Sequence, residues 1–250
     1  GGIANEAVAK STPDGYTLLT APGSSLTAVP HLQPVRFDPL KDFAAVVQTT
    51  SFSFMLVTHP SVPVQSARDL VALAKAKPGF FTYGSTGIGS AFHLAGEMFS
   101  SLADVKLLHV PYRGGSQSLT DLLGGHIAFA SQTLPSTAGQ LKSGALTALT
   151  HSGKERLAEF PNVQTLKEQG FDIVSTTWYS LSGPAGLPDN IVQKINREIG
   201  IGLAKPEFGD RLRAAGFVHE AMPVSEFRAF IDAETARWTP VIKAAGLVVK

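Results

Sequence analysis

The sequence predicts an α/β protein whose strands are mainly parallel and are covered by helices. Short apolar segments rich in β-branched residues alternate with longer segments whose apolar residues recur at helical spacing. Most of the apolar segments lack the alternation of a strand with one wet face, so we expect helices on both sides of the sheet. A chain of 250 residues with 44% hydrophobic content can bury one large core or two ordinary ones.

The expected strands are apolar runs bounded by turn residues, and the expected helices begin at capping residues. Ser66 and Asp69 have the spacing of a capping box, and Pro78 with Gly79 ends the helix that follows. The strands are expected at 16–21, 44–50, 54–58, 80–84, 107–110, 126–131, 146–150 and 173–184, and the other helices from Ser90, from Ser116 to Gly124–Gly125, near 188–204 and near 225–245.

Composition excludes several classes of function. Lys and Arg number 21 against 20 Asp and Glu, and no basic run could follow a nucleic-acid backbone. The absence of cysteine excludes disulfides, thiolate metal sites and cysteine nucleophiles, and the seven histidines lack metal-ligand spacing. No apolar run is long enough to span a membrane, and the first residues do not resemble a signal peptide. We therefore expect either a cytosolic chain or one whose targeting segment has been removed.

The stretch YGSTGIGSAFHLAGEMF, residues 83–99, begins like a phosphate-binding loop. A P-loop needs a lysine that this stretch lacks, and a dinucleotide fingerprint needs a glycine where Phe92 stands. A nucleophile elbow at Ser85 would need a small residue in place of Tyr83. These three forms of chemistry are therefore disfavoured.

What remains is a strand that runs through a glycine-rich and hydroxyl-rich loop directly into a helix. Free backbone N–H groups at a helix start suit a carboxylate. The alternative is a flexible turn whose serine only caps the helix. The loop at 21–27 has the same composition and the same two interpretations, and both loops could face one cleft. For Trp178 and Tyr179, core packing is the default and a ligand-facing aromatic is the alternative.

Several strings together resemble one family, the extracytoplasmic solute receptors of tripartite tricarboxylate transporters, called Bug or TctC. The resemblance covers essentially the whole chain and implies a periplasmic binding protein of type II-like topology, with two α/β domains and two crossovers. It implies a small-carboxylate ligand, no catalysis, no cofactor and no metal. The strings are EAVAKSTPDGYTLL (6–19), FDPLKDF (37–43), GSAFHLAGEMF (89–99), LLHVPYRGGSQSLTDLLGGHI (107–127), AEFPNVQTLKEQGF (158–171), TTWYSLSGPAGLP (176–188) and WTPVIKAAG (238–246).

The resemblance also implies domain bounds and ligand-binding residues. The second domain is expected at 52–178, and the first from 1–51 with 179–250. Family members often carry an acidic or otherwise distinctive side chain near the position of Gln132, and an acid there could balance an ammonium group. Gln132 does not provide that balance, which disfavours an amino-acid ligand. The ligand-binding residues implied are Gly23, Ser24, Ser25, Tyr83, Gly84, Ser85, Thr86, Gly87, Ser90, Ser131, Gln132, Thr133 and Trp178.

Two further departures from the family pattern bear on the ligand. Phe92 stands where the family usually has a small residue. If its ring points into the cleft, an apolar or aromatic carboxylate is favoured as the ligand. If its ring points into the core, the residue gives no information about the ligand. Family members also begin with a strand, a ligand-contacting loop, a helix and a strand that this sequence does not contain, so the first domain is expected to be incomplete. A truncated gene model or expressed fragment, a longer parent chain, and a variant completed by another subunit are the explanations, in that order.

The function expected is a periplasmic receptor that captures a dicarboxylate or aromatic carboxylate for the membrane components of a tripartite transporter. Hinge closure on the ligand is the expected mechanism. The alternatives are an enzyme acting on a small carboxylate, for which the sequence displays no nucleophile, base or metal set, and a sensor subunit that uses the same cleft.

Overall fold

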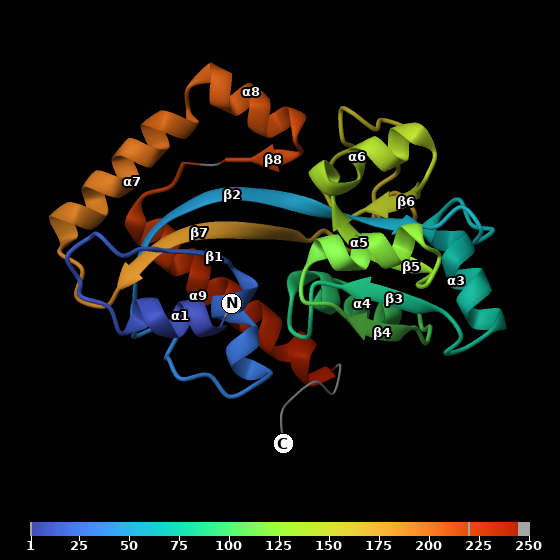
Figure 1. The fold of residues 1–250 in the computed structure, drawn as a ribbon, viewed down its shortest axis with the longest axis horizontal. Coiled ribbons are helices and arrows are strands. Elements are labelled where there is room, and N and C mark those ends of the chain that lie inside the picture. The colour runs from blue at the N-terminus through green and yellow to red at the C-terminus, as the bar shows by residue number, and fades with distance from the viewer. Residues whose placement is uncertain (1, 220, 245–250) are drawn as a thin grey trace. The chain divides into compact units, whose positions relative to one another are not determined.

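The computed structural model describes residues 2–219 and 221–244 of the chain. These residues form two compact units: unit 1 contains those up to Ser51 and from Thr177 onward, and unit 2 contains Phe52–Thr176. The chain passes between the units within the strand β2 (Phe43–Thr58) and again at the start of the strand β7 (Thr176–Pro184). Figure 1 labels the elements along the chain.

Unit 1 combines β7 and the first part of β2 with short strands and helices from both ends of the described chain. Its other elements are α1 (Gly2–Ala9), β1 (Leu19–Pro22), α2 (Ser24–Thr27), the 3-10 helix η1 (Val29–His31), α7 (Asp189–Leu203), α8 (Pro206–Ala214), β8 (Phe217–Val218) and α9 (Val224–Ala244).

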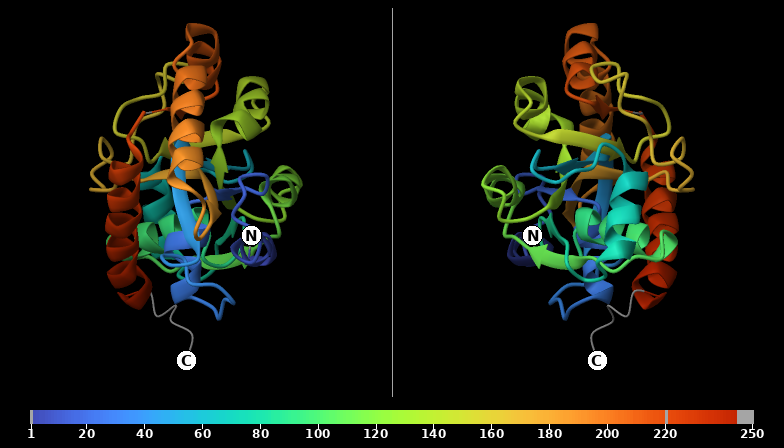
Figure 2. Two further views of the ribbon diagram at one scale, coloured as in Figure 1. Left: turned by 90° about the vertical axis from the view of Figure 1, so that its left-hand side faces the viewer. Right: turned by 90° about the vertical axis from the view of Figure 1, so that its right-hand side faces the viewer.

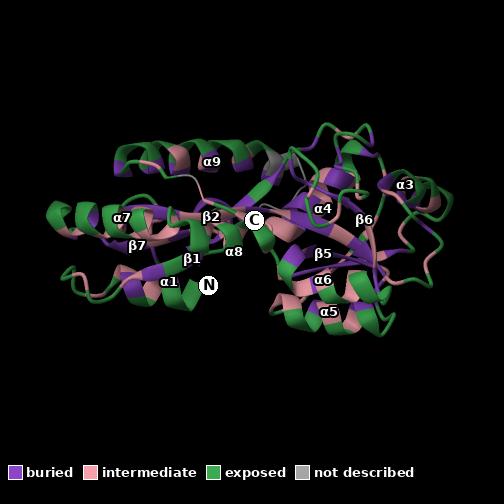
Figure 3. Cartoon of the chain, turned by 90° about the horizontal axis from the view of Figure 1, so that it is seen from above, coloured by how far each residue is buried: buried purple, intermediate pink, exposed green. Residues whose placement is uncertain are grey.

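The strands of unit 1 lie between helices. β1 pairs antiparallel with β7, β7 neighbours β2, and β8 pairs with β2. Figures 2 and 3 show α9 on one side of these strands and α1 on the other. The core follows this arrangement, since Trp178 on β7 packs with Phe227 and Ile231 of α9, whereas Val8 of α1 packs with Leu19 on β1.

Unit 2 takes the last part of β2 as one strand of a mixed sheet. β3 pairs in parallel with both β4 and β5, whereas β2 pairs antiparallel with β5 and β6. The elements are α3 (Ala67–Ala76), β3 (Thr82–Ser85), α4 (Ala91–Leu102), β4 (Leu108–Pro111), α5 (Gly115–Leu123), β5 (Phe129–Thr133), α6 (Leu134–Ser143) and β6 (Thr147–His151).

Each face of the unit 2 sheet has its own apolar core. Successive side chains of a strand point to opposite faces, so Phe129 joins the core beside α3 and α4 while Ala130 joins the core beside α5 and α6. Figure 3 shows α4 on one side of β5 and α6 with α5 on the other. Both faces are therefore covered, as the apolar runs of the sequence predicted.

The capping residues identified in the sequence are confirmed. The Ser66 hydroxyl accepts from the Asp69 N–H (3.1 Å), and the Ser90 hydroxyl accepts from the His93 N–H (3.2 Å). Gly125, just beyond α5, has φ +70°, a left-handed conformation that glycine adopts without strain. The expected helix end at residue 245 lies outside the described residues.

Several expectations were wrong. The strands expected at 44–50 and 54–58 are one strand, β2, because residues 51–53 stay extended. The sheet is not mainly parallel, since β7 and β2 make antiparallel pairs, and apolar runs do not encode strand direction. Helices α1, α6 and α8 were not expected; α6 and α8 carry Pro at their first turns, where proline is tolerated. Strand starts expected at 16, 126 and 173 lie at Leu19, Phe129 and Thr176.

Replacing the α3 cap should lower stability without changing the fold. We expect Ser66→Ala to reduce the free energy of unfolding by about 1 kcal/mol, because the Asp69 N–H loses its acceptor. Urea denaturation followed by circular dichroism measures this change. Ser101→Ala, on the exposed surface of α4, is the control and should stay within about 0.5 kcal/mol of the parent. Equal stability of both variants and the parent would contradict the capping role.

Candidate functional site

Three strands of unit 2 end at one edge of the sheet. β4 and β5 both run parallel to β3, so Ser85, Pro111 and Thr133 at their carboxyl ends lie along that edge. Each strand is followed by a helix, which begins at Ala91, Gly115 and Leu134 respectively. Helix starts carry unsatisfied N–H groups and partial positive charge, and ligands of α/β sheets gather at this edge.

Contacts between the three connections bring them together. The Tyr112 N–H donates to the Ser85 carbonyl (3.1 Å), and the Gln132 amide donates to the Gly115 carbonyl (3.4 Å). A Cβ at Gly115 would lie 3.6 Å from Gln132 Oε1 and 3.8 Å from Thr86 Cγ2. The loop after β3, the loop after β4 and the end of β5 therefore form one surface. We call residues 85–90 the anion loop.

Part of the anion loop directs its N–H groups into the protein. The Gly87 N–H donates to Ser85 Oγ (3.1 Å), the Gly89 N–H donates to His93 Nδ1 (3.1 Å), and the Ser90 N–H donates to the Gly87 carbonyl (3.1 Å). Gly87 has φ +119° and Gly89 has φ +78°, so both positions require the conformational freedom of glycine.

The other N–H groups of this segment do not bond to the protein. Within the part of the chain that the structure describes, no hydrogen bond engages the backbone N–H of Thr86, Ile88, Ala91 or Phe92. The Ser90 hydroxyl caps the helix by accepting from the His93 N–H, and the Ser90 carbonyl accepts from the Leu94 N–H. Unsatisfied N–H groups at a glycine-rich loop and at a helix start are a common feature of anion-binding sites.

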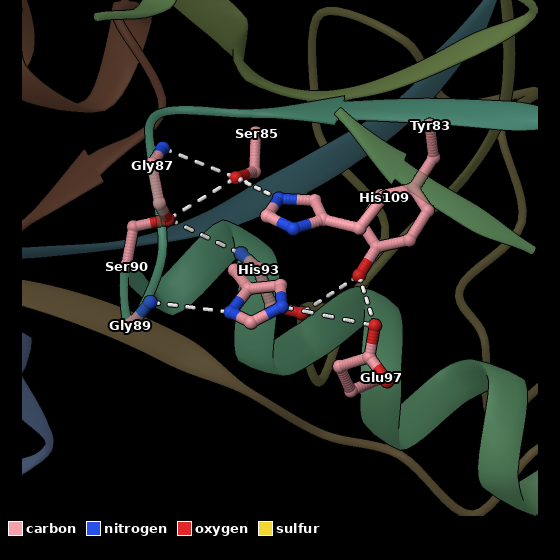
Figure 4. Close-up of polar contacts among 8 residues, drawn as sticks. All are labelled: Tyr83, Ser85, Gly87, Gly89, Ser90, His93, Glu97 and His109. Carbon is pink, nitrogen blue, oxygen red and sulfur yellow. Dashed lines mark hydrogen bonds and ion pairs between the residues drawn. The ribbon is translucent and has the colours of Figure 1, made fainter. Parts of the chain in front are cut away.

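A polar cluster of buried and half-buried side chains lies next to the anion loop (Figure 4). The rings of His93 and His109 stack with centroids 3.9 Å apart and planes 22° apart. His109 Nε2 lies 2.7 Å from Ser85 Oγ, and His93 Nε2 lies 3.7 Å from Glu97 Oε1. Tyr83 donates from its hydroxyl to the same Glu97 oxygen at 2.5 Å. The cluster thus joins β3, α4 and β4.

Burial shifts the titration of these groups. It lowers the pKa of His93, against the opposing effect of Glu97. Burial and then the neighbouring His93 lower the pKa of His109 to about 4. Burial and then the hydrogen bond to Glu97 raise the pKa of Tyr83. At neutral pH both histidines are neutral and the tyrosine keeps its proton, which matches the hydrogen bonds that they make.

Three of the expected site residues lie beneath the loop surface. Ser85 is fully buried and its hydroxyl bonds to His109 and Gly87, so the 2.7 Å contact with His109 is a structural bond in the interior. Tyr83 is 2% exposed. At Gly84, a Cβ would come within 2.6 Å of Ile127 Cδ1, so close packing requires glycine there.

The end of β5 places its three expected residues differently. Ser131 is buried beside an apolar pocket that Phe54 and Tyr83 also line, on the α4 face of the sheet. Gln132 is 2% exposed and reaches Gly115 in the loop after β4. Thr133 is half-buried, and its hydroxyl donates to Ser136 Oγ at 3.0 Å. Gln132 therefore supports the loop after β4 from beneath, and Thr133 is the more accessible of the two.

Phe92 packs against another aromatic residue of unit 2. Its ring meets the Phe54 ring edge-to-face, with centroids 6.4 Å apart and planes 76° apart. Phe54 is buried on β2, and Phe92 is half-buried at the second position of α4. The ring of Phe92 thus covers Phe54, while its backbone N–H stays among the free groups of the helix start.

The expected residues of unit 1 form a separate arrangement. The Gly23 N–H donates to the Trp178 carbonyl at 2.8 Å, and a Cβ at Gly23 would lie 2.1 Å from Cε2 of the indole. Trp178 is 2% exposed, donates to Glu234 (3.4 Å) and packs edge-on against Phe227. The sequence left open whether the Trp178 side chain packs in the core or faces a ligand, and the structure places it in the core.

The two serines beside Gly23 differ in exposure. Ser25 is buried and its hydroxyl accepts from the Asn5 amide of α1 at 3.3 Å. Ser24 is half-buried at the first position of α2. Gly23 and Trp178 are thus brought into contact, and Ser24 is the more accessible hydroxyl of the pair.

The sequence interpretation missed His93, Glu97 and His109: it found no metal-ligand spacing among the histidines, and it did not consider Glu97. One signal was present: His93 lies three residues after the helix cap Ser90 and four before Glu97, so a helix places all three within reach. His109 had no such signal, because its contact depends on the pairing of β4 with β3.

No cluster of three or more His, Asp or Glu side chains arranged to hold a metal occurs among residues 2–219 and 221–244. In the same residues, no helix is both long and apolar enough to cross a lipid bilayer.

Comparison with known proteins gives consistent matches over almost the whole chain. A family model described as "Tripartite tricarboxylate transporter family receptor", TctC, matches residues 1–247. Protein BugT of Bordetella pertussis is 31% identical over 100% of this chain and 78% of its own length. A UPF0065 protein from the gbd 5' region of Cupriavidus necator is 32% identical over 99% of this chain and 75% of its own. The solved structure of R. palustris Rpa4515 with adipate superposes with a TM-score of 0.94 at 28% identity, over 99% of this chain and 84% of that one.

Enlarging Gly23 should destabilise unit 1. We expect Gly23→Ala to lower the free energy of unfolding by about 1–3 kcal/mol, because the new methyl group overlaps the indole of Trp178, which Phe227 and Glu234 hold in place. Gly139→Ala is the matched control: its Cβ meets no atom within 4 Å in helix α6, so stability should rise by up to about 1 kcal/mol. Chemical denaturation measures both. Parent-like stability of Gly23→Ala would overturn the packing role.

Proposed function

Since the chain belongs to the tripartite tricarboxylate transporter receptor family, a family of receptors and not of enzymes, we propose that it captures a small organic carboxylate in the periplasm. In this proposal it delivers the ligand to the membrane components of a tripartite transporter. The coarser function, a solute-binding receptor for carboxylates, follows from the family match and from the adipate-bound relative. The location, the transporter partner and the chemical class of the ligand are parts of the proposal.

The free N–H groups of the anion loop and of the α4 start are the observation that carries the proposal. The free donors belong to Thr86 and Ile88 in the loop and to Ala91 and Phe92 in the first turn. In this proposal they bind one carboxylate. A micromolar dissociation constant requires about 8 kcal/mol. Hydrogen bonds to a charged group contribute roughly 1.5–3 kcal/mol each, so three or four of them reach this range before the cost of ordering the ligand.

The neutral side chain of Gln132 favours a ligand without an ammonium group. Its amide donates to the Gly115 carbonyl, and its Oε1 accepts from the Ser136 hydroxyl at 3.3 Å, so this position adds no negative charge beside the loop. An amino acid would bring an ammonium group that needs such a charge. The adipate bound to the relative Rpa4515, a linear dicarboxylate, is consistent with a ligand whose charged groups are both carboxylates.

A negative charge in the anion loop should weaken carboxylate binding. We expect Thr86→Asp to reduce adipate affinity at least tenfold, about 1.4 kcal/mol, because the added carboxylate repels the ligand. Thr86 is half-buried, so the variant can keep its fold. Chemical-shift titration with adipate, which covers micromolar to millimolar dissociation constants, provides the measurement.

The matched control for this experiment is Thr120→Asp, which adds the same charge at an exposed position further along α5. It should change adipate affinity by less than about threefold at 0.15 M ionic strength, where exposed charges are screened beyond roughly 8 Å. Equal affinity of the parent and Thr86→Asp would contradict the placement of the ligand at the anion loop. No binding of adipate, malate or benzoate by the parent chain would contradict the proposed function itself.

A further inference from the structure

We propose that His93 and His109 are positioning residues that hold the anion loop in its ligand-receiving form, and that protonation of His93 releases the loop and weakens carboxylate binding. This inference rests on the proposed function, because it takes the anion loop to be the ligand site. It assigns a role to a buried cluster that the loop's own donors do not explain. Figure 4 shows how the cluster reaches the loop from β3, α4 and β4.

His93 holds the last part of the loop through a nitrogen that accepts. The Gly89 N–H donates to Nδ1 at 3.1 Å, so Nδ1 carries no proton and the neutral ring has its proton on Nε2. Nε2 faces Glu97 Oε1 at 3.7 Å, which fixes this tautomer. Tyr83 donates to the same carboxylate oxygen and keeps Glu97 in place. The order of contacts is thus Tyr83, Glu97, His93, Gly89.

His109 holds the first part of the loop through Ser85. Its Nε2 lies 2.7 Å from Ser85 Oγ, which also accepts from the Gly87 N–H and lies 3.2 Å from the Gly87 carbonyl. The ring stacks on His93 and also packs against Tyr83, with centroids 5.0 Å apart. The two histidines therefore secure the loop on both sides of Ile88.

Securing Gly87 and Gly89 determines which donors remain for a ligand. Both N–H groups donate to acceptors inside the protein. The N–H groups of Thr86, just before Gly87, and of Ile88, between the two glycines, stay free. If the Gly89 bond were lost, the backbone of this glycine, with its positive φ, would lose its contact with the His93 ring. The free donors would then point in many directions, and the loop would pay an ordering cost on binding.

Protonation acts differently on the two rings. A charged His109 can still donate from Nε2 to Ser85 Oγ, whereas a charged His93 has a proton on Nδ1 that faces the Gly89 N–H, so the bond is lost. Two charged rings 3.9 Å apart would also repel each other. The titratable groups that face His93 are Glu97 from its own helix, His109 from β4 and Tyr83 from β3.

The direction of the pH effect follows from burial. Burial lowers the pKa of His93 while the loop is ordered, and a released loop returns this pKa toward its ordinary value near 6.5. The released form therefore binds more protons, and the ordered form loses its advantage as the pH falls below about 6.5. Above that pH the contribution of His93 to loop order is fully present.

The test uses the full chain and two replacements of His93, one that keeps an acceptor and one that keeps the ring. His93→Asn retains an acceptor near the Nδ1 position and cannot be protonated, whereas His93→Phe retains the aromatic stack without an acceptor. The probe is adipate, titrated by chemical shift at pH 8, 7, 6 and 5. Hydrogen exchange of the Gly89 amide, measured without ligand, reports loop order independently of binding.

We expect His93→Phe to weaken adipate binding at least tenfold at pH 7 and to remove the exchange protection of Gly89. His93→Asn should retain that protection and bind within about threefold of the parent at pH 7. Between pH 7 and pH 5 the parent should lose at least fivefold more affinity than His93→Asn, since titration of adipate affects both equally. His126→Asn, which replaces an exposed histidine of unit 2, should keep the pH profile of the parent.

Identical pH profiles of the parent and His93→Asn would overturn the inference, as would undiminished protection of Gly89 in His93→Phe. If His93→Phe does not fold, the comparison of the parent with His93→Asn decides alone. Should the parent bind none of adipate, malate or benzoate while Gly89 protection follows the expected pattern, the proposed function fails and the positioning of the loop is supported. Binding without that pattern overturns only the role of the histidines.

Discussion

The parallel pairing of β3 with both β4 and β5 is the constraint on which the candidate site depends. It aligns three strand ends at one edge of unit 2, and each strand leads into a helix. Without this alignment, the start of α4 would be an ordinary helix start with unsatisfied N–H groups. With it, the loops after β3 and β4 and the end of β5 meet through Tyr112, Gly115 and Gln132.

The polar cluster beneath the anion loop shows why that geometry can be held. A buried polar group without a partner costs about 1–3 kcal/mol, so the buried Tyr83 and His93 are tolerable there because the Tyr83 hydroxyl bonds to Glu97 and His93 Nε2 faces the same carboxylate at 3.7 Å. The last acceptor of this series faces the Gly89 N–H. A network with so few alternative arrangements favours one loop conformation, which is what a preorganised receptor requires.

In unit 1, a different interaction fixes the turn at Gly23. Gly23 has helical φ and ψ, so its value does not lie in conformational freedom. Its hydrogen atom allows the backbone to lie against the indole of Trp178, whose carbonyl also accepts from the Gly23 N–H. Steric contact with a buried aromatic fixes this turn, whereas hydrogen bonds to His93 and Ser85 fix the turn in unit 2.

The sequence by itself determined the α/β class, the caps Ser66 and Ser90, and the glycine-rich loop before α4, because these depend on residues only a few positions apart. Its motif strings also identified the receptor family, which the family match confirms. Only the tertiary structure decided that residues 44–58 form one strand, that the Trp178 side chain belongs to the core, and that Ser85 faces inward. Above all it stacked His109 on His93, 16 residues away along the chain. That contact arises because β4 pairs with β3 while α4 packs over them, and strand pairing joins residues that no local pattern relates.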